Sequence, residues 1–206
     1  WYIGAVLESR LSDLTILTLI SAFLVSFVWV IFMRSMDVFN REKWSHLMIV
    51  FVGGALFTFL CLPLYDIADL VLHFQINGEA MNDFLYCVGV IGGSEEVVKF
   101  IPWILFGLLA RKLHEPYDYI LYASVAALGF AFTENLMYLQ DSGSIVARSI
   151  LSTVGHMFDA SVVAYSIILA RFKFKIVFWK IVTPILGFGL AALCHGFYDF
   201  WLISES

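Results

Sequence analysis

The chain has 206 residues, of which 61% are hydrophobic and 14% are charged, and its formal net charge at pH 7 is −5. Soluble domains are about 45–50% apolar and about 25% charged, so this composition excludes an ordinary soluble domain. No basic cluster is dense enough for nucleic-acid binding, and we expect one membrane domain covering residues 1–206.

Six apolar segments are long enough to cross a bilayer, for which a helix needs roughly 20 residues. In chain order they cover residues 14–33, 46–65, 83–110, 117–140, 148–170 and 176–203. They predict an all-α, polytopic transmembrane helix bundle. The third segment contains Gly92-Gly93 and Pro102, so we expect it to kink or break, and two shorter elements are the alternative.

Basic residues occur in alternate connections, after the first, third and fifth spans, whereas the connections between them are acidic. The basic residues are Arg34, Arg41, Lys43, Arg111, Lys112, Arg171, Lys173, Lys175 and Lys180. The acidic residues are Asp66, Asp69, Glu79 and Asp141. By the positive-inside rule the basic connections are cytoplasmic, so both chain ends are expected to be extracytoplasmic.

Three charged residues lie inside the third span. Glu95 and Glu96 are adjacent, and Lys99 follows one helical turn later on a face that it shares with both. A charge near the bilayer centre costs on the order of 2.5–3.5 kcal/mol by insertion scales, so three charges indicate a function. A buried ion pair between helices is the plainer alternative.

Further polar residues are expected at a similar depth in other spans. At about 1.5 Å per residue, five groups lie about 6–18 Å below the outer ends of four spans. They are Glu95, Glu134, His156, His195 and Asp199. This shared layer predicts one polar cluster that opens outward. His195 and Asp199 share a helix face, where a carboxylate fixes the imidazole tautomer or binds the same metal. Asp159, one turn after His156, would pair with that histidine.

Four motifs follow one another inside these spans. They are EExxK at residues 95–99, FxxxEN at 130–135, a histidine at 156 that follows Arg148, and HxxxD at 195–199. Over about residues 92–201 the chain resembles the PrsW family of intramembrane proteases, which are related to the CAAX-type prenyl endopeptidase and bacteriocin-processing superfamily. The resemblance implies cleavage of a membrane-anchored protein near its extracytoplasmic side in a bacterial plasma membrane. The best-known member makes the first cut in an anti-sigma factor.

Two mechanisms fit these residues. In the metal version, His156 and His195 bind zinc together with Glu134 or Asp199, and Glu95 or Glu96 is the base. In the metal-free version, a glutamate activates water directly, and His195 with Asn135 or Lys99 polarises the substrate carbonyl. The CAAX-type relatives are argued to use the second version, but their second motif carries a histidine where this chain has Glu134-Asn135.

Two other functions compete with the protease. The protease hypothesis implies a membrane protein with a transmembrane segment as the substrate and the lipid bilayer as the surroundings. A proton- or ion-coupled transporter would use the same polar cluster, but it requires polar groups through the full depth of the membrane. A non-catalytic scaffold that binds a partner helix is the third hypothesis.

Overall fold

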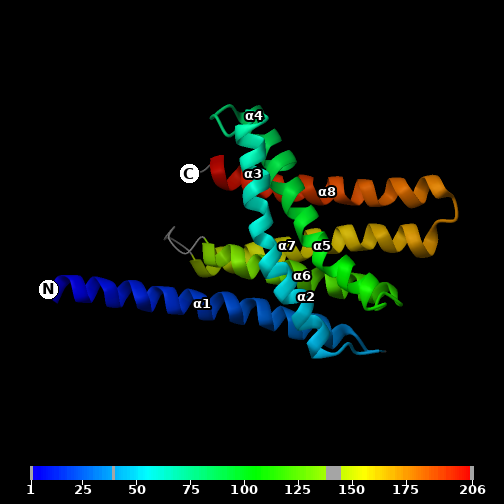
Figure 1. Ribbon diagram of the computed structural model, residues 1–206, viewed down its shortest axis with the longest axis horizontal. Coiled ribbons are helices and arrows are strands. Elements are labelled where there is room, and N and C mark those ends of the chain that lie inside the picture. The colour runs from blue at the N-terminus through cyan, green and yellow to red at the C-terminus, as the bar shows by residue number, and fades with distance from the viewer. Residues whose placement is uncertain (1, 39, 138–144, 205–206) are drawn as a thin grey trace.

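The computed structural model describes residues 2–38, 40–137 and 145–204, and these residues form helices and no strand (Figure 1). The α-helices are α1 (Tyr2–Met36), α2 (Trp44–Phe57), α3 (Cys61–Leu70), α4 (Ala80–Tyr86), α5 (Gly93–Leu109), α6 (Pro116–Met137), α7 (Ile145–Ile168) and α8 (Val177–Ser204). The shorter elements are the 3-10 helix η1 (Thr58–Leu60) and the π-helices η2 (Cys87–Gly92) and η4 (Leu169–Lys173). The all-α prediction is confirmed.

Five helical segments of the described chain are long and apolar enough to cross a membrane. They are Leu19–Met36, Trp44–Leu70, Pro116–Met137, Ile150–Lys173 and Val177–Ile203. They match the first, second, fourth, fifth and sixth predicted spans. The end of the fourth predicted span and Asp141 lie outside the described residues.

The third predicted span is a helical segment built from α4, η2 and α5 without an intervening loop. The break that we expected at Gly92-Gly93 is a change from π-helix to α-helix, and Pro102 lies inside α5. In the second span, η1 separates α2 from α3. Pro63 has no N–H to donate to the carbonyl of Phe59, which explains the irregular turn there.

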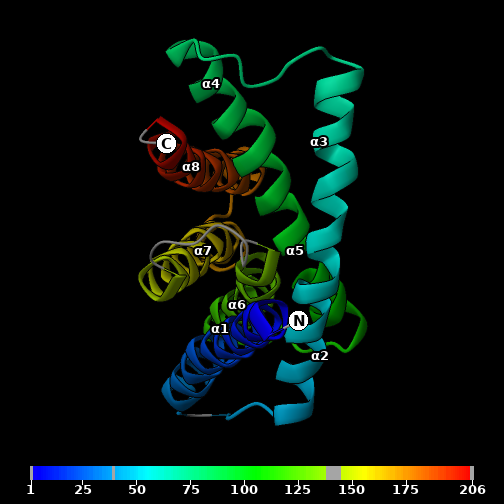
Figure 2. The ribbon, with the colours of Figure 1, turned by 90° about the vertical axis from the view of Figure 1, so that its left-hand side faces the viewer.

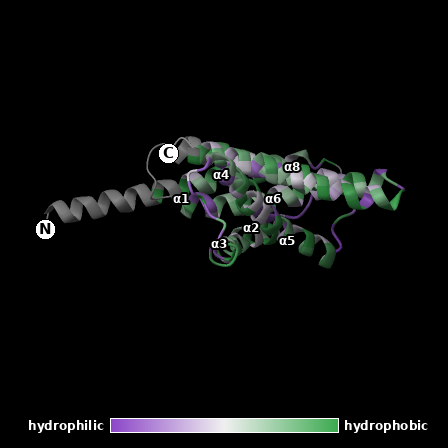
Figure 3. Cartoon of the chain, turned by 90° about the horizontal axis from the view of Figure 1, so that it is seen from above, coloured by the Kyte–Doolittle hydropathy of each residue, from purple (hydrophilic) through white to green (hydrophobic). Residues whose placement is uncertain are grey.

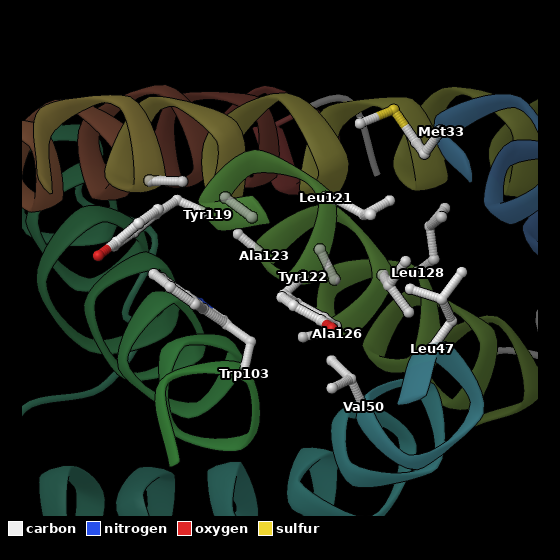
Figure 4. Close-up of a cluster of buried hydrophobic side chains, with 14 of the residues drawn as sticks. Met33, Leu47, Val50, Trp103, Tyr119, Leu121, Tyr122, Ala123, Ala126 and Leu128 are labelled. Atoms are coloured by element: carbon white, nitrogen blue, oxygen red, sulfur yellow. The ribbon is translucent and has the colours of Figure 1, made fainter. Parts of the chain in front are cut away.

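Helix α6 is the centre of the hydrophobic core, and all its residues from 121 to 131 are buried. Figure 4 shows Tyr119, Tyr122 and Ala126 of α6 packed among side chains of α2 and of α5. Small residues allow this packing. A Cβ added to Gly54 of α2 or to Gly129 of α6 would overlap the backbone of the other helix. The two backbones therefore touch, as is common where helices pack in membranes.

Helices α6, α7 and α8 run side by side, and α2–α3 and α4–α5 cross them steeply (Figure 1). The connections α1–α2, α5–α6 and α7–α8 all lie on the right of Figure 1, opposite the ends of the chain. Nine of the twelve lysine and arginine residues lie in or next to these three connections. Figure 3 shows hydrophobic residues along the helices and hydrophilic residues at the connections.

The α1–α2 connection is held by Glu42, whose side chain is buried. Burial by itself raises the pKa of this carboxyl. The hydrogen bond with His46 Nδ1 (2.8 Å) and the charge of Lys112 outweigh that effect, so the pKa of Glu42 lies below its ordinary value of 4.5. The backbone N–H of Glu42 also donates to Asp37 (2.8 Å), which closes the connection on itself.

Candidate active site

The π-helix η2 brings the beginning of α5 against α8. A π-helical turn contains about one residue more than an α-helical turn, and such turns occur frequently at functional sites. The Ser94 hydroxyl donates to the backbone carbonyl of Val90 inside this irregular segment. A Cβ on Gly92 would lie 2.5 Å from the carbonyl oxygen of Ala192, so glycine is needed for the close approach of η2 to α8.

Lys99 lies at the centre of the polar cluster. Its Nζ is 2.8 Å from Glu96 Oε1 and 3.5 Å from Glu95 Oε2, as the predicted spacing requires. The same Nζ is 2.7 Å from Nδ1 of His156 and 3.1 Å from Nδ1 of His195. The side chains of Lys99 and Glu96 are each 1% exposed. Lys99 therefore joins α5 to both α7 and α8.

Four carboxylates surround the His195 imidazole. Nδ1 is 2.9 Å from Glu96 Oε1 and 3.9 Å from Asp159 Oδ2. Nε2 is 3.2 Å from Glu95 Oε2 and 3.3 Å from Asp199 Oδ2. So many acidic oxygens in a buried site favour a cation there. We expected Asp159 to pair with His156, but its carboxylate faces His195.

His156 joins Lys99 to Glu134. Because Nδ1 of His156 can accept from the Lys99 ammonium, the proton of the neutral ring belongs on Nε2. Nε2 then donates to Glu134 Oε2 (2.5 Å), which also accepts from the Ser152 hydroxyl (3.3 Å). A carboxylate that orients an imidazole in this way is the usual outer partner of a metal-binding histidine.

The structure brings seven of the eight predicted site residues into one network of contacts. They are Glu95, Glu96, Lys99, Glu134, His156, His195 and Asp199. The eighth, Asn135, is directed elsewhere: its amide donates to Thr153 Oγ1 (3.3 Å) and joins α6 to α7.

Besides Ser152, Tyr65 and Asp159 belong to the network although they were not among the predicted site residues. The Tyr65 hydroxyl donates to Glu95 Oε1 (2.7 Å) from α3, and Asp159 contacts His195 from α7. Tyr65 lies at the end of a predicted span, where tyrosines are common as interfacial anchors, so its position alone carried no signal. Asp159 had a weak signal, because it is an acidic residue one turn from His156 inside an apolar segment.

Among the residues that the structure describes, two groups of buried side chains have the donor atoms and spacing for a metal ion. They are Glu95 with His156 and His195, and Glu96 with Asp159 and His195. In each group the ligand atoms lie within 4.8 Å of one another. Glu134, which we expected beside the two histidines, belongs to neither group.

Two buried carboxylate oxygens of the cluster accept no hydrogen bond. Oε2 of Glu95 and Oε2 of Glu96 are buried and have no hydrogen-bond partner. The Glu95 oxygen lies within ion-pair distance of Lys99 and His195, but not with hydrogen-bond geometry. Buried oxygens without donors are costly, and a cation would satisfy them, so the donor set fits a divalent metal.

A cavity of about 450 Å³ reaches the cluster between α7 and α8. Its polar lining consists mainly of Glu134, His156, Asp159, His195 and Asp199. Glu95 and Glu96 lie behind the His195 imidazole and do not line the cavity. A molecule in the cavity would therefore meet the two imidazoles, with the paired glutamates directly behind His195.

Comparisons with known proteins agree on one family. The family model described as PrsW family intramembrane metalloprotease matches residues 42–206. Protease PrsW of Clostridioides difficile (strain 630) is 30% identical, covering 94% of this chain and 80% of the relative. Protease PrsW of Shouchella clausii (strain KSM-K16) is 31% identical, covering 82% of this chain and 75% of the relative. No solved structure matches the chain.

Proposed function

Because the chain belongs to the PrsW family of intramembrane metalloproteases and is itself a multi-pass intramembrane endopeptidase, we propose that it cleaves a membrane-anchored protein near the extracytoplasmic side. An anti-sigma factor is an example of such a substrate. The observation that carries this proposal is the buried network around His195, which meets a cavity of about 450 Å³.

Glu95, His156 and His195 are the residues that would hold zinc, and Glu134 and Asp199 would orient the two imidazoles. This assignment puts two histidines and one carboxylate around the ion, which is a common catalytic zinc ligand set. When bound, zinc would act as a Lewis acid on the scissile carbonyl. The Lys99 ammonium contacts both Nδ1 atoms, so those atoms can bind another cation only if the Lys99 side chain moves.

Glu96 is the proposed general base. Of the adjacent Glu95 and Glu96, it is the one outside the proposed zinc ligands, and its Oε2 has no hydrogen-bond partner, so it can accept a proton from water. Its Oε1 is 2.9 Å from His195 Nδ1 and 2.8 Å from Lys99 Nζ. Those contacts fix the carboxylate, which can hold the proton that it takes from water and then pass it to the leaving amine.

We further propose a bacterial plasma membrane as the location, with both chain ends extracytoplasmic and residues 1–206 acting as one protease domain. The grouping of the three basic connections at one end of the molecule supports this orientation (Figure 1). The cavity lies toward the opposite end, where α8 finishes, which supports cleavage near the extracytoplasmic side.

N-terminal proteomics of bacterial cells tests the protease proposal. Cells that express the wild type should contain new extracytoplasmic N-termini of membrane proteins, and these should be lost with Glu96→Gln and with His195→Ala. Glu42→Gln and His46→Ala are matched controls, because this pair lies in and beside the α1–α2 connection and should leave cleavage intact. Unchanged cleavage in both cluster variants would refute the site. Ion transport that needs Glu96 without any new N-terminus would favour the transporter.

A further inference from the structure

A membrane-embedded substrate must reach the cluster from the side. Helix α8, which carries His195 and Asp199, packs mainly against η2 on one side and α7 on the other. On one side, α8 is sealed against η2. A Cβ on Gly196 of α8 would overlap the backbone of Val88, and a Cβ on Gly92 would lie 2.5 Å from the Ala192 carbonyl. Backbones that meet through glycines leave no space for a peptide.

On its other side, α8 separates from α7 near the cluster. The two helices are in contact at the end close to η4, where a Cβ on Gly187 would overlap the Ser166 side chain. Toward the cluster they enclose the cavity of about 450 Å³. Gly155 of α7 lines this cavity, and a Cβ added to it would have no atom within 4 Å. Figure 2 shows α7 and α8 next to each other beside the C-terminus.

The lining of the cavity is apolar at its opening to the molecular surface and polar at its inner end. Leu151 and Phe158 of α7 and Trp201 of α8 line it and are each more than half exposed on the molecular surface. In a bilayer that surface faces lipid. The floor is formed by the polar groups of the cluster, including His156 and His195. An apolar mouth suits hydrophobic side chains, and the polar floor can pair with backbone amides that leave a helix.

We propose that the gap between α7 and α8 is the lateral entrance through which an extended segment of a transmembrane substrate reaches the cluster. This inference rests on the proposed protease function. An extended segment is required because the amides of a helix are hydrogen-bonded within the helix, whereas those of an extended segment are free to pair with the polar floor of the cavity. The sealed contact of α8 with η2 leaves α7–α8 as the open side of this helix.

Filling the entrance tests the proposal. Gly155→Leu would put a side chain into the cavity from a position where an added Cβ has no atom within 4 Å. It should abolish cleavage of the substrate that proteomics identifies, in liposomes that contain both proteins. Gly189→Leu is the matched control, because Gly189 is an exposed glycine of α8 outside the cavity and also has open space. Gly189→Leu should cleave like the wild type, and both variants should keep the thermal stability of the wild type.

Photo-crosslinking provides a readout that needs no catalysis. In Glu96→Gln, benzoylphenylalanine in place of Phe158 should crosslink to that same substrate, whereas benzoylphenylalanine in place of Phe197 should not. Phe197 is similarly exposed but lies outside the cavity lining. Equal cleavage by both glycine variants, or crosslinks from position 197 alone, would overturn the entrance while the protease function stands. Absence of cleavage by the wild type would instead refute the protease function, and the entrance with it.

Discussion

Replacing Lys99 by methionine would remove the positive charge at the centre of the cluster. Nζ of Lys99 is 2.8 Å from Glu96 Oε1, and at an effective dielectric constant of about 20 two unit charges at this distance attract by about 6 kcal/mol. Desolvation offsets much of that attraction. Removing one partner of a buried pair nevertheless costs about 3–5 kcal/mol, because the Glu96 carboxylate remains buried without its ammonium partner. We expect Lys99→Met to lower the free energy of unfolding by this amount.

A double-mutant cycle isolates the pair. Glu96→Gln combined with Lys99→Met removes both charges, so it should recover about 1–3 kcal/mol relative to the sum of the single variants. The free energy of unfolding can be measured in mixed micelles with increasing SDS, followed by tryptophan fluorescence, because Trp103 is buried in the core. Lys112→Met is the matched control. Its Nζ is 3.9 Å from Glu42 Oε1 and its side chain is 32% exposed, so about 0–1 kcal/mol is expected.

Two results would refute this reasoning. The first is a Lys99→Met variant that is no less stable than Lys112→Met. The second is a double variant whose loss equals the sum of the single losses, which would mean that Lys99 and Glu96 do not interact in the folded protein.

Three further predictions concern the metal, the orientation and the α1–α2 connection. Elemental analysis of the purified protein should find about one zinc per chain, and the His156→Ala variant should lose that zinc. An active protein without metal would instead favour direct activation of water by a glutamate. In a Cys194→Ser background, a membrane-impermeant thiol reagent should label Glu79→Cys from outside intact cells and fail to label Lys173→Cys, and the reverse pattern would overturn the orientation. Because the pKa of Glu42 is lowered on folding, its contribution to stability is complete above about pH 4.5 and declines as the pH falls through the folded-state value. In the Glu42→Gln variant the melting temperature should therefore fall less steeply below about pH 4.5 than in the wild type. The same pH dependence in both proteins would contradict a lowered pKa of Glu42.

The sequence determined the parts of the fold that depend on one helix at a time. Apolar runs of about 20 residues predicted the spans because a bilayer core has a fixed thickness. Spacing by three and four residues placed Lys99 on the face of Glu95 and Glu96, and placed Asp199 next to His195, because a helix has a fixed period. These contacts occur in the structure at 2.8–3.5 Å.

Only the tertiary structure decided how these helices face one another. Asn135 lies next to Glu134 in the sequence, yet it is directed to Thr153, and Tyr65 reaches Glu95 from a helix that carried no signal. Rotation and tilt between helices depend on where backbones can approach, and glycines such as Gly92 set those points through contacts with distant residues. Such glycine contacts hold α8 tightly against η2, whereas a cavity separates α8 from α7 near the cluster. This cavity is therefore a property of the packed bundle and not of any single span.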